Sequence, residues 1–248
     1  MIVRQVQCAF QILAFFAERR SPATLTEIAE HFGWPRSSTF NLLETLSSSG
    51  FLYEPKFRAG YYPSHKLLRL AQNAIMDGPV SERLRNCVVN IAQRTDETAA
   101  LCALSGTQTV FVDVVEASSP IRYFAEVGLR VPTYATSAGR ALLSMLSPKE
   151  RLAILKKSEL VRYAPNTIVD IEAIENEVQL SKARGWALNI NGFEPELVGI
   201  AVPIALAQRQ FALLIAGPSY RMKDKIEQLA QMLKDEVDAY LRDRADNE

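Results

Sequence analysis

The stretch Leu25–Gly50, LTEIAEHFGWPRSSTFNLLETLSSSG, predicts two short helices joined by a tight turn at residues 33–35. Thr24 just before it is a typical N-cap, because its hydroxyl can accept a hydrogen bond from a free amide of the first turn. Pro35 suits the start of the second helix and Gly50 its end. The apolar residues of the first helix recur with helical spacing, at Leu25, Ile28, Ala29 and Phe32.

The second helix carries small polar side chains on the side that cannot face a core. At about 100° per residue, Thr39 and the leucines face inward. The opposite side and its flanks hold Arg36, Ser37, Ser38, Phe40, Asn41, Glu44, Thr45 and Ser48. Amides and hydroxyls can bind base edges, arginine can reach guanine or phosphate, and an aromatic edge can contact a thymine methyl. This face favours DNA recognition, although a helical hairpin inside a core is the alternative, because short matches of this kind arise by chance.

A basic hairpin is predicted directly after these helices. Residues 51–53 form one short strand, residues 54–60 a turn, and Tyr61-Tyr62 the returning strand. Such a wing would place Lys56 and Arg58 along a phosphate backbone. We therefore expect contacts with double-stranded DNA from Thr26, Arg36, Ser37, Ser38, Thr39, Phe40, Asn41, Thr45, Lys56 and Arg58.

The bulk composition is that of a globular protein with a real core. Of the 248 residues, 48% are hydrophobic and 23% charged, and the formal net charge is zero. No stretch approaches the roughly 18 apolar residues of a membrane helix, and the N-terminus lacks a signal-peptide pattern. We expect a cytoplasmic protein with no membrane partner. The three cysteines are too widely spaced for a disulfide framework or a metal pair.

Three segments are predicted: a DNA-binding domain over residues 1–63, a linker helix over 64–78, and a larger domain over 79–248. The first helix, residues 3–18, is expected to support the others through Val6, Phe10, Leu13 and Phe16. The linker helix is rich in leucine and alanine, so it packs either on its own domain or on the same helix of a second subunit. We favour packing on a second subunit, because a symmetric dimer can bind the two half-sites of an operator at once.

In the larger domain the hydrophobic pattern changes to strands separated by helices. Strands are expected at 98–104, 108–115, 121–126, 186–190, 197–205 and 210–216, and helices at 80–94, 137–146, from 147, 170–184 and 222–242. Runs of strands with helices between and after them predict an α+β domain with a mainly antiparallel sheet.

Catalytic motifs are missing from the sequence. It contains no G-x-S-x-G, no Gly-rich phosphate loop and no H-E-x-x-H, and both histidines precede the larger domain. We expect no enzyme activity, no metal and no cofactor. Residues 136–139, Thr-Ser-Ala-Gly, lie where a strand passes into a helix, so their amides could bind a small anion such as a carboxylate. The alternative is that Thr136 or Ser137 only caps the helix.

The run Leu25–Leu52 resembles the winged helix–turn–helix of the IclR family of bacterial transcription regulators. GLRVPTYATSAGRALLS, residues 128–144, and RGWALNINGFEPELVGIAVPI, residues 184–204, resemble the two signature stretches of its effector-binding domain. Residues 216–218 followed by Arg221 are similar to its C-terminal strand-to-helix junction. The resemblance implies a GAF-like α+β domain, a small organic effector that controls operator binding, and a homodimer or a dimer of dimers. It places the effector near Tyr123, Tyr134, Thr136, Ser137, Ala138, Asn189, Gly199, Leu214 and Ala216.

Several positions depart from the family pattern. The usual aspartate is Asn189, the usual cysteine is Gly199, and two usual serines are Leu214 and Ala216. Asn41 stands where many relatives carry arginine. These changes suit a less polar or bulkier effector, and the alternative is that the pocket is unused. The resemblance therefore identifies neither the effector nor the operator sequence. A sensor that acts through a protein partner instead of DNA is the alternative function.

Overall fold

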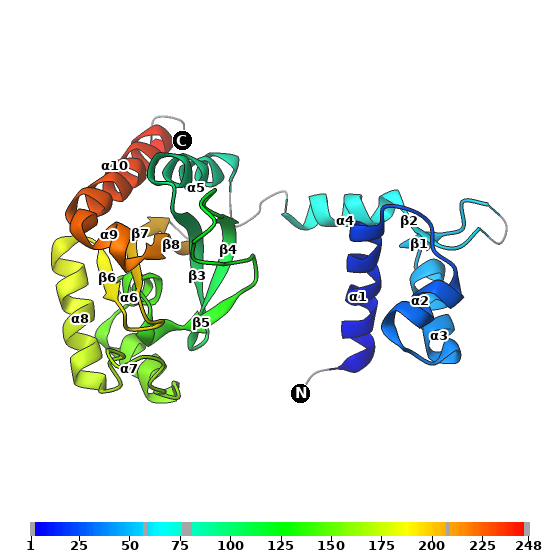
Figure 1. Cartoon of the computed structure of the whole chain (residues 1–248), viewed down its shortest axis with the longest axis horizontal. Coiled ribbons are helices and arrows are strands. Elements are labelled where there is room, and N and C mark those ends of the chain that lie inside the picture. Colours follow the sequence, from blue (N-terminus) through cyan, green and yellow to red (C-terminus); the bar gives the residue numbers. More distant parts are fainter. Residues whose placement is uncertain (1–2, 57–58, 76–80, 207–208, 246–248) are drawn as a thin grey trace. The chain divides into compact units, whose positions relative to one another are not determined.

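The computed structural model describes residues 3–56, 59–75, 81–206 and 209–245. The chain divides into two compact units, residues 1–78 and 79–248, each with its own core. The α+β architecture expected from the sequence is confirmed, with a helix–turn–helix in the first unit and a sheet covered by helices in the second (Figure 1).

The first unit packs three helices on a two-stranded hairpin and ends in a fourth helix. Its elements are α1 (Arg4–Arg19), α2 (Leu25–Phe32), α3 (Arg36–Ser48), β1 (Leu52–Tyr53), β2 (Tyr62–Pro63) and α4 (His65–Ile75). One small core holds them together, with Ile12, Phe16, Ile28, Leu43 and Leu52 at most 2% exposed. The packing of the helix–turn–helix therefore depends on a few large apolar side chains.

The predicted supporting face of α1 is wrong in its first half. Val6 and Phe10 are 53% and 67% exposed, and the buried residues are Ile12, Phe15 and Phe16. The core of this unit is short, so only the second half of the helix reaches it. The first half leaves an apolar stripe on the surface.

The second unit is built on a six-stranded antiparallel sheet with the order β5-β4-β3-β8-β7-β6. The strands are β3 (Thr98–Ser105), β4 (Gln108–Val115), β5 (Arg130–Pro132), β6 (Ala187–Ile190), β7 (Leu197–Leu206) and β8 (Arg209–Pro218). The helices are α5 (Glu82–Thr95), η1 (Thr133–Ala135), α6 (Ser137–Ser144), α7 (Pro148–Lys157), α8 (Ile171–Arg184), α9 (Ser219–Met222), η2 (Lys223–Lys225) and α10 (Ile226–Ala245).

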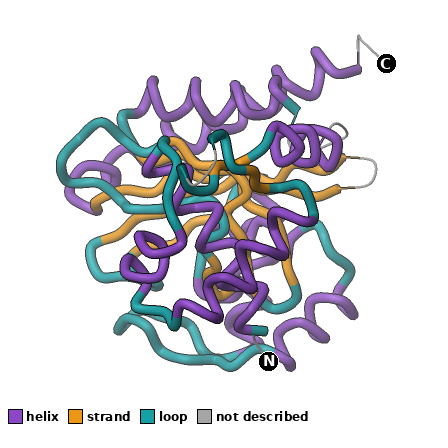
Figure 2. Tube along the Cα trace, turned by 90° about the vertical axis from the view of Figure 1, so that its right-hand side faces the viewer, coloured by secondary structure: helices purple, strands orange, loops and turns teal. Residues whose placement is uncertain are grey.

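The two faces of this sheet carry side chains of different size. Large residues such as Leu101, Ile200 and Leu213 meet α5 and α10 on one face. Figure 2 shows α10 lying along the strands. Small residues such as Ala100 and Ala201 meet α6 on the other face. The small side chains let the short helix α6 approach the sheet closely.

One predicted strand, residues 121–126, is not a strand. The segment belongs to the loop between β4 and β5, and Ile121 and Phe124 are 63% and 64% exposed. Tyr123 and Ala125 are buried between these exposed residues, so the segment alternates like a strand but pairs with no strand. The loop is instead held by side chains, including the Thr98 hydroxyl, which donates to the Tyr123 carbonyl at 2.6 Å. The strand that pairs with β4 on the side away from β3 is the later β5.

Candidate functional sites: a DNA-facing helix and a pocket

The helix–turn–helix is fixed by local hydrogen bonds that the sequence signals. Thr24 and Glu27 form a capping box at the start of α2, which confirms Thr24 as the N-cap. Bonds from the Thr24 amide and hydroxyl lower the pKa of Glu27 to about 2. Gly33 ends the helix with φ +65°, and the rings of Phe32 and Trp34 stack across the turn at 4.3 Å. The turn is therefore held rigidly between α2 and α3.

Helix α3 presents most of the expected DNA-contacting residues to solvent. It begins at Arg36 after Pro35, which is the N-cap and not the first helical residue. Phe40 is 47% exposed despite being aromatic, and Thr26 of α2 is half-buried. The other exposed members of the expected set on α3 are Arg36, Ser37, Ser38, Asn41 and Thr45.

Thr39 is a correction to that set. Its side chain is completely buried, and its hydroxyl donates to the Pro35 carbonyl at 3.1 Å. The helical period places it beside Leu43 on the inner side of α3. Thr39 therefore supports the helix and cannot contact a base.

The exposed groups of α3 differ in what they have left to bind. The Thr45 hydroxyl donates to the Asn41 carbonyl at 2.7 Å, so its proton is used within the helix. Within the described residues, the side chains of Arg36 and Asn41 have no hydrogen-bond partner. Their donors and acceptors are available to an external ligand.

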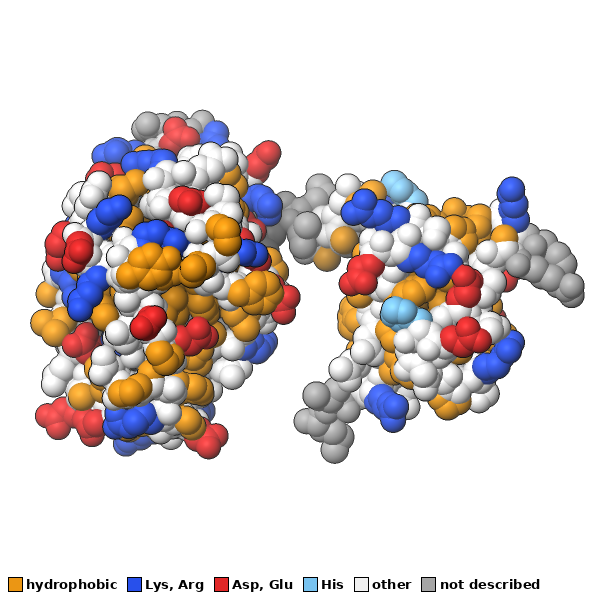
Figure 3. All heavy atoms as spheres, in the orientation of Figure 1, with side chains coloured by type: hydrophobic (Ala, Val, Ile, Leu, Met, Phe, Trp, Pro, Cys, Tyr) orange, Lys and Arg blue, Asp and Glu red, His pale blue; other side chains and the backbone are white. Residues whose placement is uncertain are grey.

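A short hairpin follows α3, as the sequence predicts. Gly50 has φ +77°, and Leu52 and Tyr53 pair with Pro63 and Tyr62. Lys56 in the connecting segment is exposed, whereas Arg58 lies outside the described residues. On the face drawn in Figure 3, basic and acidic side chains are interspersed over both units.

The second unit contains a pocket between α6 and the sheet. It encloses about 360 Å³ of empty space, part of it open to solvent. The lining residues are Phe111, Tyr123, Val131, Thr136, Ser137, Ala138, Asn189, Phe193, Leu197, Gly199, Leu214 and Ala216.

The pocket gathers eight of the nine residues expected near an effector, but not Tyr134. The Tyr134 hydroxyl donates to the Val161 carbonyl and accepts from its amide, both at 2.7 Å. Its ring belongs to a separate core cluster with Leu143 and Leu155. Because Tyr134 lies in the short helix η1 behind α6, it fixes a loop and does not line the cavity.

Phe111, Val131, Phe193 and Leu197 line the pocket without having been singled out from the sequence. The alternation of strand β4 could have identified Phe111 as a buried residue, because Thr109, Phe111 and Asp113 are the buried residues of that strand. Phe193 lies in an irregular loop, where no hydrophobic period applies.

The start of α6 gives the pocket its polar end. The Thr136 hydroxyl accepts a hydrogen bond from the Gly139 amide at 3.2 Å, so Thr136 caps the helix. This capping role is the alternative that the sequence left open for Thr136. A Cβ on Gly139 would lie 1.9 Å from the Thr133 carbonyl oxygen, so only glycine fits there. Ser137 is 2% exposed and lines the pocket, and no described residue bonds to its hydroxyl. Its Oγ lies 2.6 Å from where a Cβ on Gly199 would be.

The amide of Asn189 is already used by the protein. Its Nδ2 donates to the Ala135 carbonyl, and its Oδ1 accepts from the Gly192 amide at 2.8 Å. Asn189 therefore braces η1 and the β6–β7 loop. An aspartate could not make the first of these bonds, because an ionised carboxylate only accepts.

Burial also controls the ionisation of groups around the pocket. Desolvation raises the pKa of the Tyr123 hydroxyl, with a smaller contribution from Glu194. Burial likewise raises the pKa of the Cys102 thiol. Tyr123 is therefore a neutral hydrogen-bond donor near pH 7.

Among the described residues, no three or more His, Cys, Asp or Glu side chains come together to hold a metal ion. None of the helices in that part of the chain is long and apolar enough to cross a membrane.

Comparisons with known proteins cover nearly the whole chain. Residues 5–55 match the model of the IclR helix-turn-helix domain, and residues 72–240 match that of the bacterial transcriptional regulator IclR C-terminal domain. The HTH-type transcriptional regulator XynR of Escherichia coli is 25% identical over 203 residues, which is 82% of this chain and 81% of that protein.

Solved structures share the fold. The crystal structure of the Thermotoga maritima IclR superposes with a TM-score of 0.76 at 26% identity, covering 97% of this chain and 98% of that one. An IclR homologue from Microbacterium hydrocarbonoxydans, complexed with 4-hydroxybenzoate, superposes with a TM-score of 0.68 at 22% identity, covering 95% and 97%. The chain belongs to the IclR family of bacterial transcriptional regulators, with a helix–turn–helix DNA-binding domain and a C-terminal effector-binding domain.

Proposed function

We propose that the regulator reads its operator with the outward side of α3. The observation that carries this is that the polar side chains of Arg36 and Asn41 are exposed and unbonded, while Thr39 and Leu43 anchor the helix from behind. Asn41 can bond adenine edges, and Ser38 and Phe40 flank it. Lys56 and Arg58 would contact phosphates beside the recognition helix.

For the effector we propose a small molecule with an apolar body and one carboxylate. Most of the pocket wall is apolar, and no lysine or arginine lines it among the described residues. The first amides of α6 and the Ser137 hydroxyl lie at its polar end and can bind a carboxylate. Tyr123 also lines the pocket, and its hydroxyl can donate a further hydrogen bond.

The active form is proposed to be a homodimer or a dimer of dimers. Val6 and Phe10 on α1 and Leu68 and Leu70 on α4 are each about half exposed or more, at 53%, 67%, 49% and 52%. A second copy would cover these side chains and supply a second recognition helix. Because its target is chromosomal DNA, we place the regulator in the cytoplasm and assign it no catalytic step.

A mobility-shift experiment with promoter DNA at several salt concentrations tests the first proposal. Specific binding should persist at salt concentrations that abolish binding to random DNA. Equal loss on both DNAs would refute operator reading by α3.

A thermal-shift screen tests the second proposal. The panel contains aromatic and branched aliphatic monocarboxylates, 4-hydroxybenzoate among them, and the matching amides. A ligand that binds the native state must raise its melting temperature. Stabilisation by the acids but not by the amides is expected. Stabilisation by neither would refute the carboxylate assignment.

A further inference from the structure

Two walls of the effector pocket come from loops and not from the sheet. Of its twelve lining residues, ten belong to sheet strands or to the capped start of α6. Only Tyr123 and Phe193 come from loops. Tyr123 is 9% exposed, so its side chain is buried at this wall. These two loops are therefore the walls of the pocket that are fixed neither by sheet pairing nor by α6.

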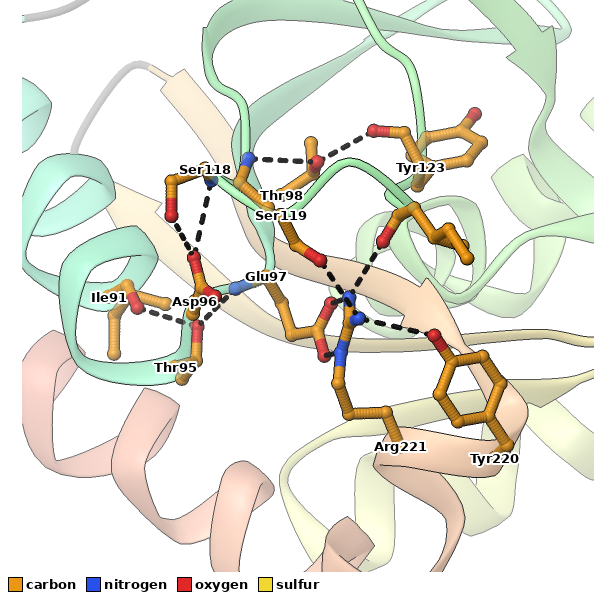
Figure 4. A network of polar contacts seen from close by, with 12 residues as sticks. Ile91, Thr95, Asp96, Glu97, Thr98, Ser118, Ser119, Tyr123, Tyr220 and Arg221 are labelled. Carbon is orange, nitrogen blue, oxygen red and sulfur yellow. Dashed lines mark hydrogen bonds and ion pairs between the residues drawn. The ribbon is translucent and has the colours of Figure 1, made fainter.

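The Tyr123 loop is tied to the helix α9 by the side chain of Arg221. One terminal nitrogen of its guanidinium donates to the Ile121 carbonyl at 3.1 Å, and the other to the Ser119 hydroxyl at 3.3 Å (Figure 4). The same guanidinium makes a two-pronged ion pair with Glu97, in which Nε donates to Oε1 at 2.5 Å and Nη2 donates to Oε2 at 2.7 Å. Glu97 is 2% exposed, so the pair positions the guanidinium from inside the fold.

The surroundings of this pair leave little freedom. A Cβ on Gly217 would lie 2.1 Å from Glu97 Oε2, so the carboxylate rests directly on the backbone of β8. The hydrogen bonds between Arg221 and Glu97 raise the pKa of Arg221. An arginine presents five donors in a fixed fork, which allows it to bind the carboxylate and the loop at once.

The Phe193 loop is tied to the same short helix by Ser219. The Ser219 amide donates to the Glu196 carbonyl at 2.6 Å, and its hydroxyl donates to Asn191 Oδ1 at 2.7 Å. Asn191 and Glu196 have φ of +54° and +57°, a conformation that non-glycine residues adopt only when it is held. Ser219 bonds to both of these positions.

We propose that α9 is the common anchor of both loop walls of the pocket, with Arg221 positioning the Tyr123 wall and Ser219 the Phe193 wall. Neither residue lines the pocket; each acts through the loop that it holds. A ligand that shifts either wall pulls on α9, which leads through η2 into α10. The inference rests on the proposed effector function of this pocket, but its test does not require a ligand.

The deciding variant is Arg221→Lys. A lysine keeps a positive charge opposite Glu97 but has one nitrogen in place of three, so it cannot reproduce the fork that binds Glu97, Ser119 and the Ile121 carbonyl from separate nitrogens. Hydrogen exchange of the full-length protein, read by mass spectrometry, reports local opening. Peptides over residues 116–127 should exchange roughly tenfold faster, while peptides from β3 and β8 stay unchanged.

Arg94→Lys is the matched control. Arg94 pairs with Glu236 of α10 at 3.2 Å in the same unit and touches neither pocket wall. It should leave residues 116–127 unchanged. Unchanged exchange of that loop in Arg221→Lys would overturn the proposal, and so would an equal increase in every peptide, because that would be global destabilisation.

Ser219→Ala tests the second wall independently. The expected result is faster exchange over residues 191–196, severalfold and smaller than for Arg221→Lys because the amide bond remains, with residues 116–127 unaffected. No change over residues 191–196 would remove Ser219 from the proposal. A failure of the whole thermal-shift panel would instead count against the effector function and leave the exchange result intact.

Discussion

The outward side of α3, which we propose reads DNA, and the pocket of the second unit are opposite kinds of site. The first is assembled from one continuous helix, and Arg36 and Asn41 keep their hydrogen-bonding groups free for a partner. The pocket is assembled from five strands, one helix and two loops, and Asn189 has already used its amide within the fold. Its shape depends on side chains that are small or missing, such as Gly199 and Ala216. One site is defined by groups on a surface and the other by space in an interior.

The largest expected effect comes from removing the support behind α3. Leu43→Ala deletes a completely buried side chain from a small core and should lower the free energy of unfolding of the first unit by about 2–5 kcal/mol. Operator binding should fall with it. Thermal unfolding and DNA affinity measured together check this.

Leu180→Ala is the control for that variant, because Leu180 on α8 is 56% exposed. It should change stability little. If Leu43→Ala were no worse than Leu180→Ala, the small core would not be what holds the outward side of α3 in place.

A variant of the free surface separates specific from general binding. Asn41→Ala removes groups with no partner in the described fold, so stability should be unchanged. Affinity for the operator should fall by about 1–3 kcal/mol per half-site, with little loss on random DNA. Competition binding with both DNAs measures the difference.

Asn176→Ala makes the same chemical change at an exposed position of α8 and should have no effect on DNA binding. Parallel losses on operator and random DNA in Asn41→Ala would make Asn41 a phosphate contact or a structural residue.

How far each site could be predicted follows from the same contrast. Helical period, the capping box at Thr24 and the turn at Gly33 are local properties, so the sequence locates α3 and its outward side. The prediction of DNA contacts fails at Thr39. Its hydroxyl and its place in the motif suggest a DNA contact, but the helical period turns its side chain inward. The prediction of the buried face fails on α1, because a hydrophobic period cannot tell a face buried in this core from one left on the surface.

The pocket could be placed only through the family resemblance and the start of α6. Which strands bring Gly199 and Leu214 beside Ser137 depends on long-range pairing, such as Ala201 with Leu214 and Gly199 with Ala216. No local pattern specifies that register. Tyr134 illustrates the limit: it precedes the α6 motif, yet the short helix η1 turns it away from the cavity.

Filling the pocket should abolish the response to effector and leave DNA binding by the first unit intact. In Gly199→Leu the new side chain would enter the cavity between Ser137 and Leu214. The effector response should disappear, stability should fall by about 1–3 kcal/mol, and operator affinity should stay nearly intact. Operator affinity with and without a stabilising acid from the thermal-shift panel, beside the melting temperature, measures all three.

Ala205→Leu, at an exposed position of the same strand β7, is the control and should keep the response. A folded Gly199→Leu protein that responds normally would place the effector elsewhere.

The smallest effect is expected from the charges that flank α3. Arg36→Ala and Lys56→Ala each remove an exposed cation, so folding should be unaffected. Each phosphate contact contributes about one unit to the slope of log affinity against log salt, or two in a symmetric dimer. Binding to all DNA sequences should weaken alike and the slope should flatten by that amount, whereas Lys157→Ala at the end of α7 in the other unit should leave it unchanged.

Affinity titrations at four or more salt concentrations give the slope, and equal slopes for wild type, Arg36→Ala and Lys56→Ala would show that neither cation contacts the DNA backbone. Such a result, together with a large loss on Asn41→Ala, would mean that α3 reads bases without the flanking phosphate contacts that the hairpin is proposed to make.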